Sequence, residues 1–427
     1  MTESMLIILA IWFASLFLGP PIWLTIAVAG AVFVLHHGFP GVMIAQQEVG
    51  AVNSFTFVAA PLFILMGNIM NSAGITRRIF NFAAACTAWM KGGLAQANIL
   101  GSVIFAGTSG SAIADAGGIG TLEIKAMTDE GYDAETAAAI TAASATIGPI
   151  IPPSVPMIVY GVYAEVSVGG LFLGGVIPGL LMAAALMVLV RIVAIRRRFP
   201  VHPFPGAAGL WRAFRAAFFA LLTPVILFAG MLSGVFTPTE AAAAATLYAL
   251  ILGLFVYRDF SLRDLPKLIL DTVETTGVVV ALVMAAKLLA WCLAISRIPQ
   301  AAGEWITALT VNPLVYLLIV NILLLVVGCF MEALAAMLIL VPILVPVAMK
   351  LGIDPIQFGV IFVLNLMIGT ITPPVGVVLY VVSNIARVPF ERLSRAVVPY
   401  LVPLFAVLAA LSLWPSLTTW LPKLVLR

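Results

Sequence analysis

The segments GTSGSAIAD at 107–115 and IGPIIPP at 147–153 decide the fold of this chain, because the second half repeats IGPIIPP closely and also repeats the glycine that opens GTSGSAIAD, whose next residues it replaces with Cys329, Phe330, Met331 and Glu332. The second copy begins at Gly328 and ends in IGTITPP at 368–374, at a constant offset of 221 residues without a gap. Two apolar halves that are interrupted by Gly and Pro at corresponding positions are typical of secondary transporters built from internal repeats. Matched positions in this register, which pairs 107–187 with 328–408, include Gly131 and Gly352, Asp133 and Asp354, Gly148 and Gly369, and Pro178 and Pro399.

The composition predicts a polytopic membrane protein. Of 427 residues, 63% are hydrophobic and 9% are charged, and the mean hydropathy is +1.17. Nearly every window of twenty residues is apolar enough to span a bilayer, which excludes a soluble domain. We expect about ten to twelve spans, counting re-entrant pieces, joined by short loops. The few Lys and Arg residues mark cytoplasmic loops and do not indicate nucleic-acid binding.

The breaks divide each half into scaffold spans, a re-entrant helical hairpin and a broken transmembrane helix. Backbone that is not helical is tolerated at membrane depth only where protein buries it or where it lines a watery cavity. The predicted fold class is therefore an all-α polytopic membrane protein. Its predicted parts are a first repeat at 1–198 with hairpin 95–127 and broken helix 136–163, an interfacial linker at 199–215, and a second repeat at 216–427 with hairpin 315–350 and broken helix 355–380.

The distribution of basic residues indicates that the two repeats have inverted topology. The segment 165–174 has no basic residue, whereas its partner at 386–395 carries three Arg residues. One span later the bias reverses, because the basic segment 191–198 corresponds to the uncharged segment 412–419. By the positive-inside rule, equivalent loops then lie on opposite sides of the membrane. Lys350 does not follow this bias.

The hairpin tips and helix breaks are the candidate binding site. Carbonyls at a helix C-terminus together with a Ser or Thr hydroxyl make an oxygen-rich cage that suits Na⁺, and the N-terminus of the next half-helix suits an anion. We expect Thr108, Ser109 and Ser111 to act in this way in the first hairpin. Asp115 and Glu332 are acids in apolar helical context, which favours a functional role. Glu123 lies near the polar break at 129–135 and is expected at a solvated helix end.

At these residues the chain resembles the large membrane subunit of tripartite ATP-independent periplasmic (TRAP) transporters of the dicarboxylate type. The resemblance covers essentially the whole chain. It rests on GTSGSAIAD at 107–115, IGPIIPPS at 147–154, FTPTEA at 236–241 and GTITPPVG at 369–376.

This resemblance implies an elevator-type, Na⁺-coupled importer of an organic acid anion in the bacterial inner membrane. It implies two partners, a small four-span membrane subunit and a periplasmic binding protein that delivers the substrate. The coupling ion would be Na⁺, at Ser109, Ser111, Asp115 and Gly148 and at Gly328, Glu332, Gly369 and Thr372. The substrate, a C4-dicarboxylate, sugar acid or keto acid, would lie at Thr108, Ser109, Gly110, Pro152, Pro153, Pro373 and Pro374.

Two alternatives remain open at the level of sequence. One is a stand-alone Na⁺/carboxylate symporter of the same superfamily. The other is an intramembrane serine protease, because residues 107–110 match Gly-x-Ser-Gly with Ser109 as nucleophile. That chemistry needs a base beside the serine, and His36, His37 and His202 all lie outside the centres of the spans. We therefore predict that the chain is not an enzyme.

Overall fold

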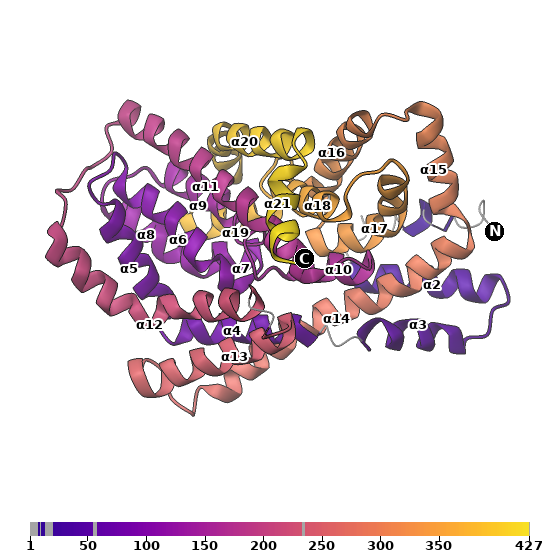
Figure 1. Cartoon of the computed structure of the whole chain (residues 1–427), viewed down its shortest axis with the longest axis horizontal. Helices are drawn as coiled ribbons and strands as arrows, with labels where there is room; N and C mark the ends of the chain where they lie inside the picture. Colours follow the sequence, from indigo (N-terminus) through magenta and orange to yellow (C-terminus); the bar gives the residue numbers. More distant parts are fainter. Residues whose placement is uncertain (1–6, 9, 13–19, 54–57, 233–234, 427) are drawn as a thin grey trace.

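The computed structural model describes residues 7–8, 10–12, 20–53, 58–232 and 235–426, and within these ranges the chain forms helices and no strand (Figure 1). The helices of the first half are α2 (Ile22–His36), α3 (Val42–Val52), α4 (Ala59–Ser72), α5 (Ile75–Thr87), α6 (Gly93–Ser109), α7 (Ala112–Gly117), α8 (Ile119–Asp129), α9 (Ala134–Ala145), α10 (Val155–Tyr163) and α11 (Val168–Arg197). The second half contains α12 (Gly206–Leu232), α13 (Pro238–Ile251), the π-helix η2 (Leu252–Tyr257), α14 (Leu265–Ile295), α15 (Ile298–Leu309), α16 (Pro313–Phe330), α17 (Ala333–Lys350), α18 (Pro355–Gly369), α19 (Val377–Ala386), α20 (Phe390–Leu413) and α21 (Ser416–Val425).

The helix boundaries follow the offset of 221 residues. The first arm of each hairpin, α6 or α16, ends at Ser109 or at Phe330, and the second arm begins at Ala112 or Ala333. The turn after each hairpin contains a glycine with positive φ, 89° at Gly131 and 76° at Gly352. Next comes an aspartate N-cap, and in both halves its carboxylate accepts hydrogen bonds from the first turn of the following helix, α9 or α18. The copies differ in one respect, because the second arm is continuous in α17 but is divided into α7 and α8 in the first half.

Each broken helix stops where prolines remove backbone donors or where glycine changes the direction of the chain. In the first half α9 ends at Ala145, and α10 begins after Ser154, whose hydroxyl accepts a hydrogen bond from the Met157 amide at 3.2 Å. In the second half α18 ends at Gly369, and α19 begins after Gly376, which has a φ of 56°. The peptide bonds Pro152–Pro153 and Pro373–Pro374 are both cis.

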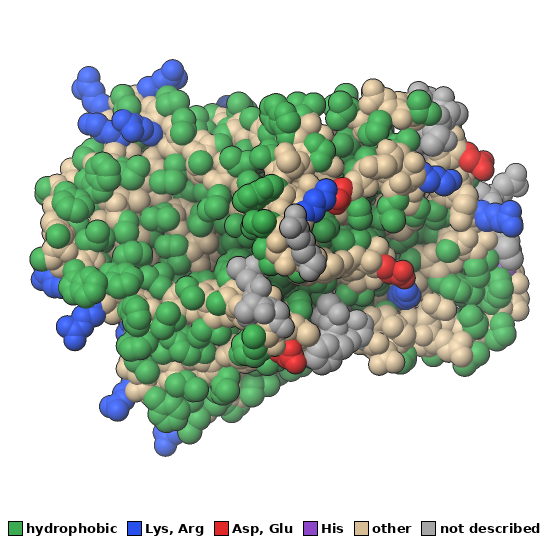
Figure 2. All heavy atoms as spheres, in the orientation of Figure 1, with side chains coloured by type: hydrophobic (Ala, Val, Ile, Leu, Met, Phe, Trp, Pro, Cys, Tyr) green, Lys and Arg blue, Asp and Glu red, His purple; other side chains and the backbone are tan. Residues whose placement is uncertain are grey.

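The helices have the lengths, and the surface has the hydrophobic composition, of a multi-pass membrane protein. In its described part, seven helices are long and apolar enough to cross a bilayer, and α4 with α5 makes an eighth candidate that is bent by 70°. Shorter apolar helices, including α2, α18 and α19, supply the remaining pieces expected from the sequence. Figure 2 shows hydrophobic side chains over most of the visible face, with Lys and Arg mainly near its left and right ends. Such a surface suits contact with lipid.

Ion pairs at one end of the molecule support the inverted topology. Arg197, at the end of α11, contacts Asp133 at 2.7 Å, and Arg392, at the start of α20, contacts Glu135 at 3.4 Å. The basic segments of both halves therefore meet at the turn before α9. The corresponding turn before α18 lies elsewhere, because the Pro355 carbonyl there accepts a hydrogen bond from the hydroxyl of Tyr160, near the end of α10. Equivalent turns of the two halves thus occupy different ends, as inverted repeats require.

The two halves interlock at their hairpins and breaks. The second hairpin packs against the first broken helix through α17 and α10, and the first hairpin packs against the second broken helix through α7 and α19. Helix α14 packs along α2, α3, α4 and α17, and so borders this central bundle (Figure 1). The segment 199–215, expected as a linker, overlaps the start of α12, which begins at Gly206.

Candidate functional site

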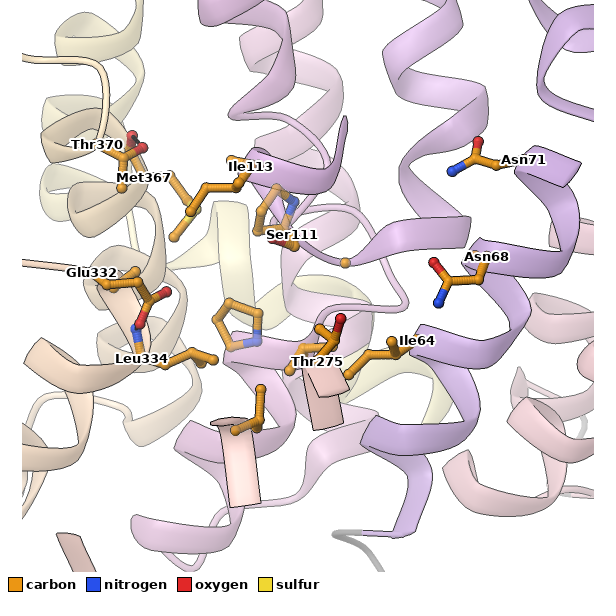
Figure 3. A pocket seen from close by; sticks show the side chains of 18 residues that line it. Ile64, Asn68, Asn71, Ser111, Ile113, Thr275, Glu332, Leu334, Met367 and Thr370 are labelled. Atoms are coloured by element: carbon orange, nitrogen blue, oxygen red, sulfur yellow. Dashed lines mark hydrogen bonds between the residues drawn. The ribbon is translucent and has the colours of Figure 1, made fainter. Parts of the chain in front are cut away.

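A cavity of about 160 Å³ lies between the two hairpin tips and the helices α4 and α14 (Figure 3). The first hairpin contributes Ser111 and the second contributes Glu332, so both repeats reach the same space. The wall opposite the second tip is formed by α4, with Thr275 of α14 beside it. The polar side chains of the described lining are Asn68, Asn71, Ser111, Thr275, Glu332 and Thr370.

The tip of the first hairpin needs a glycine. Gly110 has a φ of 59° and ends α6 in the left-handed region, which side chains other than glycine rarely adopt. A Cβ at this position would also lie 3.0 Å from the Val155 amide nitrogen and 3.1 Å from the Pro153 carbonyl oxygen. Gly110 therefore lets the first tip lie directly on the start of α10, in the first broken helix.

The tip of the second hairpin is held by a capping carboxylate. Glu332 is the N-cap of α17, and its Oε2 accepts hydrogen bonds from the amides of Leu334 at 2.8 Å and Ala335 at 3.2 Å. The Cys329 carbonyl accepts a hydrogen bond from the Gly376 amide at 3.0 Å. This bond joins the second tip to the start of α19, the position that corresponds to Val155 in the first half.

Each hairpin lies against the break of its own half, through a close backbone approach in the second half and through a buried carboxylate in the first. A Cβ at Gly369 would lie 2.7 Å from the Cα of Gly328, so these two glycines touch through their backbones. In the first half, the carboxylate of Asp115 occupies the space where a Cβ of Gly148 would be. Asp115 is 2% exposed. The carbonyls, hydroxyls and carboxylates around these contacts are oxygen donors of the kind that hard cations prefer.

Three of the predicted site residues line the cavity: Gly110, Ser111 and Glu332. The side chains of Thr108 and Ser109 lie outside the part of the chain that the structure describes. The other predicted residues lie outside the cavity lining, along the contacts between tips and breaks or in the breaks themselves: Asp115, Gly148, Pro152, Pro153, Gly328, Gly369, Thr372, Pro373 and Pro374. Of these, Pro374 is exposed.

The sequence reasoning missed the wall contributed by α4 and α14. Asn68 and Asn71 face the cavity from α4, and Thr275 faces it from α14. A signal was present, because Asn68 and Asn71 are two amides three residues apart in an otherwise apolar helix. Amide side chains in such a setting usually have hydrogen-bonding partners or face a polar cavity.

The expectation for Glu123 is wrong. The sequence places this residue near a polar break, but the structure buries it in α8 with 1% of its surface exposed. Its Oε1 lies 3.2 Å from the position of a Cβ at Gly101, against α6. Helix α8 continues beyond Glu123 to Asp129, so the polar break starts more than one turn after this residue. Glu123 lies on the buried face of α8 and not at its solvated end.

Comparisons with known proteins agree with this architecture. The family profile described as "Tripartite ATP-independent periplasmic transporter, DctM component" matches residues 9–417. In structure, the chain is similar to the YdaH transporter of Alcanivorax borkumensis, with a TM-score of 0.67 and 16% identity over 87% of each chain. At this identity the similarity concerns the fold alone.

Curated relatives extend over most of the chain. The sialic acid TRAP transporter large permease protein SiaM of Vibrio cholerae is 47% identical over 97% of both proteins. The C4-dicarboxylate large permease DctM of Pseudomonas aeruginosa is 42% identical over 86% of both. The 2,3-diketo-L-gulonate large permease YiaN of Escherichia coli is 35% identical over 97% of this chain and 98% of its own length. All three are named as transporter permeases, which agrees with the prediction that the chain is not an enzyme. The chain therefore belongs to the DctM-component family of tripartite ATP-independent periplasmic transporters.

Proposed function

We propose that this chain is the large permease subunit of a Na⁺-coupled transporter that imports an organic acid anion across the bacterial inner membrane. A periplasmic binding protein would deliver the anion, and a small membrane subunit would complete the permease. The observation that carries this proposal is the cavity between the two hairpin tips, directly in front of two oxygen-rich breaks.

The chemistry of the cavity suits an anion that arrives with cations. None of its described lining residues is Lys, Arg or His. The charge of a carboxylate would therefore be balanced by amides at the start of α10 and by Na⁺ behind the tips, because Glu332 already occupies the first amides of α17. The proposed Na⁺ ligands are Ser109, Ser111, Asp115 and Gly148 in the first half, and Gly328, Glu332, Gly369 and Thr372 in the second.

Energetics favour coupling to a cation. Moving a dianion into a cell at about −100 mV costs roughly 4.6 kcal/mol, and two Na⁺ ions cancel that charge. Two sites therefore predict electroneutral uptake of a dianion, whereas the membrane potential would drive uptake of a monoanion.

The packing suggests what would move. Each hairpin contacts the broken helix of the other half, so the two hairpins and two broken helices form one packed unit. Helices α4 and α14 border this unit, and α5 follows α4 at a bend of 70°. We propose that the unit slides against these helices as a rigid body, in an elevator movement.

Uptake into proteoliposomes tests this function. Vesicles that contain the chain and its small subunit would be given a library of carboxylates, with and without a Na⁺ gradient and with and without the cognate binding protein. Uptake that requires both supports the proposal. Uptake that needs Na⁺ alone would instead identify a stand-alone symporter, and uptake that is independent of Na⁺ would refute the assigned ion sites.

A Ser109→Ala variant separates transport from the remaining alternative. A serine protease would lose peptide cleavage completely, whereas a Na⁺ ligand would change the Na⁺ dependence of uptake.

A further inference from the structure

The cavity has a polar wall on α4, formed by Asn68 and Asn71. Figure 3 shows both amides on the side of the cavity opposite Glu332 and Thr370. Since they are three residues apart on one helix, they lie side by side on the same face. A ligand held at the hairpin tips would therefore present its far end to this wall.

Hydrogen bonds fix which atom each amide offers to the cavity. The Asn68 Nδ2 donates to the Thr272 hydroxyl at 2.9 Å, and that hydroxyl donates to the Leu268 carbonyl at 2.7 Å. The hydroxyl of Thr76 donates to the Asn71 Oδ1 at 2.7 Å. Among the described residues, the Asn68 Oδ1 acceptor and the Asn71 Nδ2 donors then have no partner, so the wall presents an acceptor beside a donor.

An adjacent acceptor and donor are complementary to hydroxyl or amide groups, which both donate and accept. A carboxylate only accepts hydrogen bonds, so it would be repelled by the Asn68 Oδ1. The described lining contains no Lys, Arg or His that could offset this repulsion. Apolar neighbours, Ile64 on α4 and Val279 on α14, complete the wall and suit the carbon skeleton of a ligand.

We propose that Asn68 and Asn71 determine specificity for a hydroxylated carboxylic acid, whose carboxylate lies at the hairpin tips and whose hydroxyl or amide groups bind the wall of α4. This inference rests on the proposed function and narrows it. The preferred substrate is then a sugar acid with one carboxylate, and a C4-dicarboxylate without hydroxyl groups is a poor substrate.

The test compares three probes, N-acetylneuraminate, gluconate and succinate, each supplied together with the cognate binding protein to proteoliposomes that contain the complete permease. Variants Asn68→Leu and Asn71→Leu are nearly isosteric and remove the exposed polar atoms. Asn81→Leu is the matched control, because Asn81 is an exposed amide on α5 outside the cavity lining. Thermal unfolding of each purified variant reports whether it folds.

We expect the wild type to import at least one hydroxylated acid more efficiently than succinate. Each variant in the wall should raise the KM for that acid by about 5- to 20-fold, the effect of about one lost hydrogen bond, with kcat changed less than KM. The KM for succinate should change by less than a factor of two, and Asn81→Leu should leave all values unchanged.

Two outcomes would overturn the inference without affecting the proposed function: preferential Na⁺-driven import of succinate, or an unchanged KM for the hydroxylated acid in a folded Asn71→Leu variant. A folded wild-type permease that imports other carboxylates with Na⁺ but neither hydroxylated probe would also overturn the inference alone, whereas import of no carboxylate at all would refute the proposed function. If Asn68→Leu fails to fold, Asn71→Leu decides the question, because the Asn71 side chain is exposed and its substitution leaves the bond between α4 and α14 intact.

Discussion

Substitution of Gly369 by alanine tests whether the second hairpin and the second break form one ion site. The new Cβ would lie 2.7 Å from both the carbonyl carbon and the Cα of Gly328. Ordinary contacts of a Cβ begin at 3.4 Å, so the two backbones must separate by about 0.7 Å. No flexible side chain can absorb this movement, because the contacted atoms belong to the backbone. Overpacking of this kind costs about 1–3 kcal/mol, partly offset by up to about 1 kcal/mol from the higher helix propensity of alanine.

We expect Gly369→Ala to raise the Na⁺ concentration for half-maximal uptake by about tenfold, since tenfold corresponds to about 1.4 kcal/mol. The assay is Na⁺-dependent uptake in proteoliposomes, with thermal unfolding in detergent as a measure of stability. Gly277→Ala is the control, because among the described residues nothing lies within 4 Å of a Cβ at this position in α14. Uptake by Gly369→Ala with the Na⁺ dependence of the wild type would refute the assignment of Gly328 and Gly369 to an ion site.

Two further predictions concern side chains that fix the geometry around this core. Asn365 donates from its Nδ2 to the Asn321 carbonyl at 2.9 Å and to the Asn321 Oδ1 at 2.8 Å. The variant Asn365→Leu should therefore lower the free energy of unfolding by about 1–3 kcal/mol and weaken the Na⁺ dependence of uptake. The variant Gln357→Leu removes a 2.9 Å hydrogen bond from Gln357 to the Leu411 carbonyl and should lower stability without changing the Na⁺ dependence. Parallel unfolding and uptake assays separate these effects. Burial raises the pKa of Asp133, but hydrogen bonds from Thr136 and Arg197 outweigh it and hold this pKa below its usual value. The stabilisation by Asp133 is therefore complete above the ordinary carboxyl pKa of about 4 and is lost as the pH falls through the lowered value, so the deficit of Asp133→Asn in unfolding temperature should shrink in acid.

The parts of the fold that were predictable from sequence depend on local signals repeated in both halves. Gly131 and Asp133 terminate one helix and cap the next, and Gly352 and Asp354 repeat this in the second half. These residues act through their own backbone and first-turn hydrogen bonds, so they need no tertiary context. The register therefore predicts the hairpins and the breaks.

The parts that were not predictable depend on contacts between distant segments. Asn68 bonds to Thr272, 204 residues away, and only this contact fixes which atom of the amide faces the cavity. Burial of Glu123 depends likewise on the approach of α6 at Gly101. A helical pattern indicates that a residue lies on a helix, but the neighbours of its face come from packing.

The two hairpin tips meet at one cavity with different chemistry. The second tip contributes Glu332, and one oxygen of this carboxylate is already bonded to the amides that begin α17. At the first tip, the carboxylate of Asp115 is instead buried beside Gly148, outside the cavity lining. The charge of an ion at the first break would therefore be neutralised by Asp115, which lies behind the tip. An ion at the second break would be coordinated by backbone carbonyls, and its charge would be neutralised by Glu332, which faces the substrate. Because α17 packs against α10 and α7 packs against α19, loading one proposed site would change the surroundings of the other. We therefore expect the two ions to bind cooperatively and with unequal affinity, so a sigmoidal dependence of uptake on Na⁺ should become hyperbolic when only the second site is disrupted.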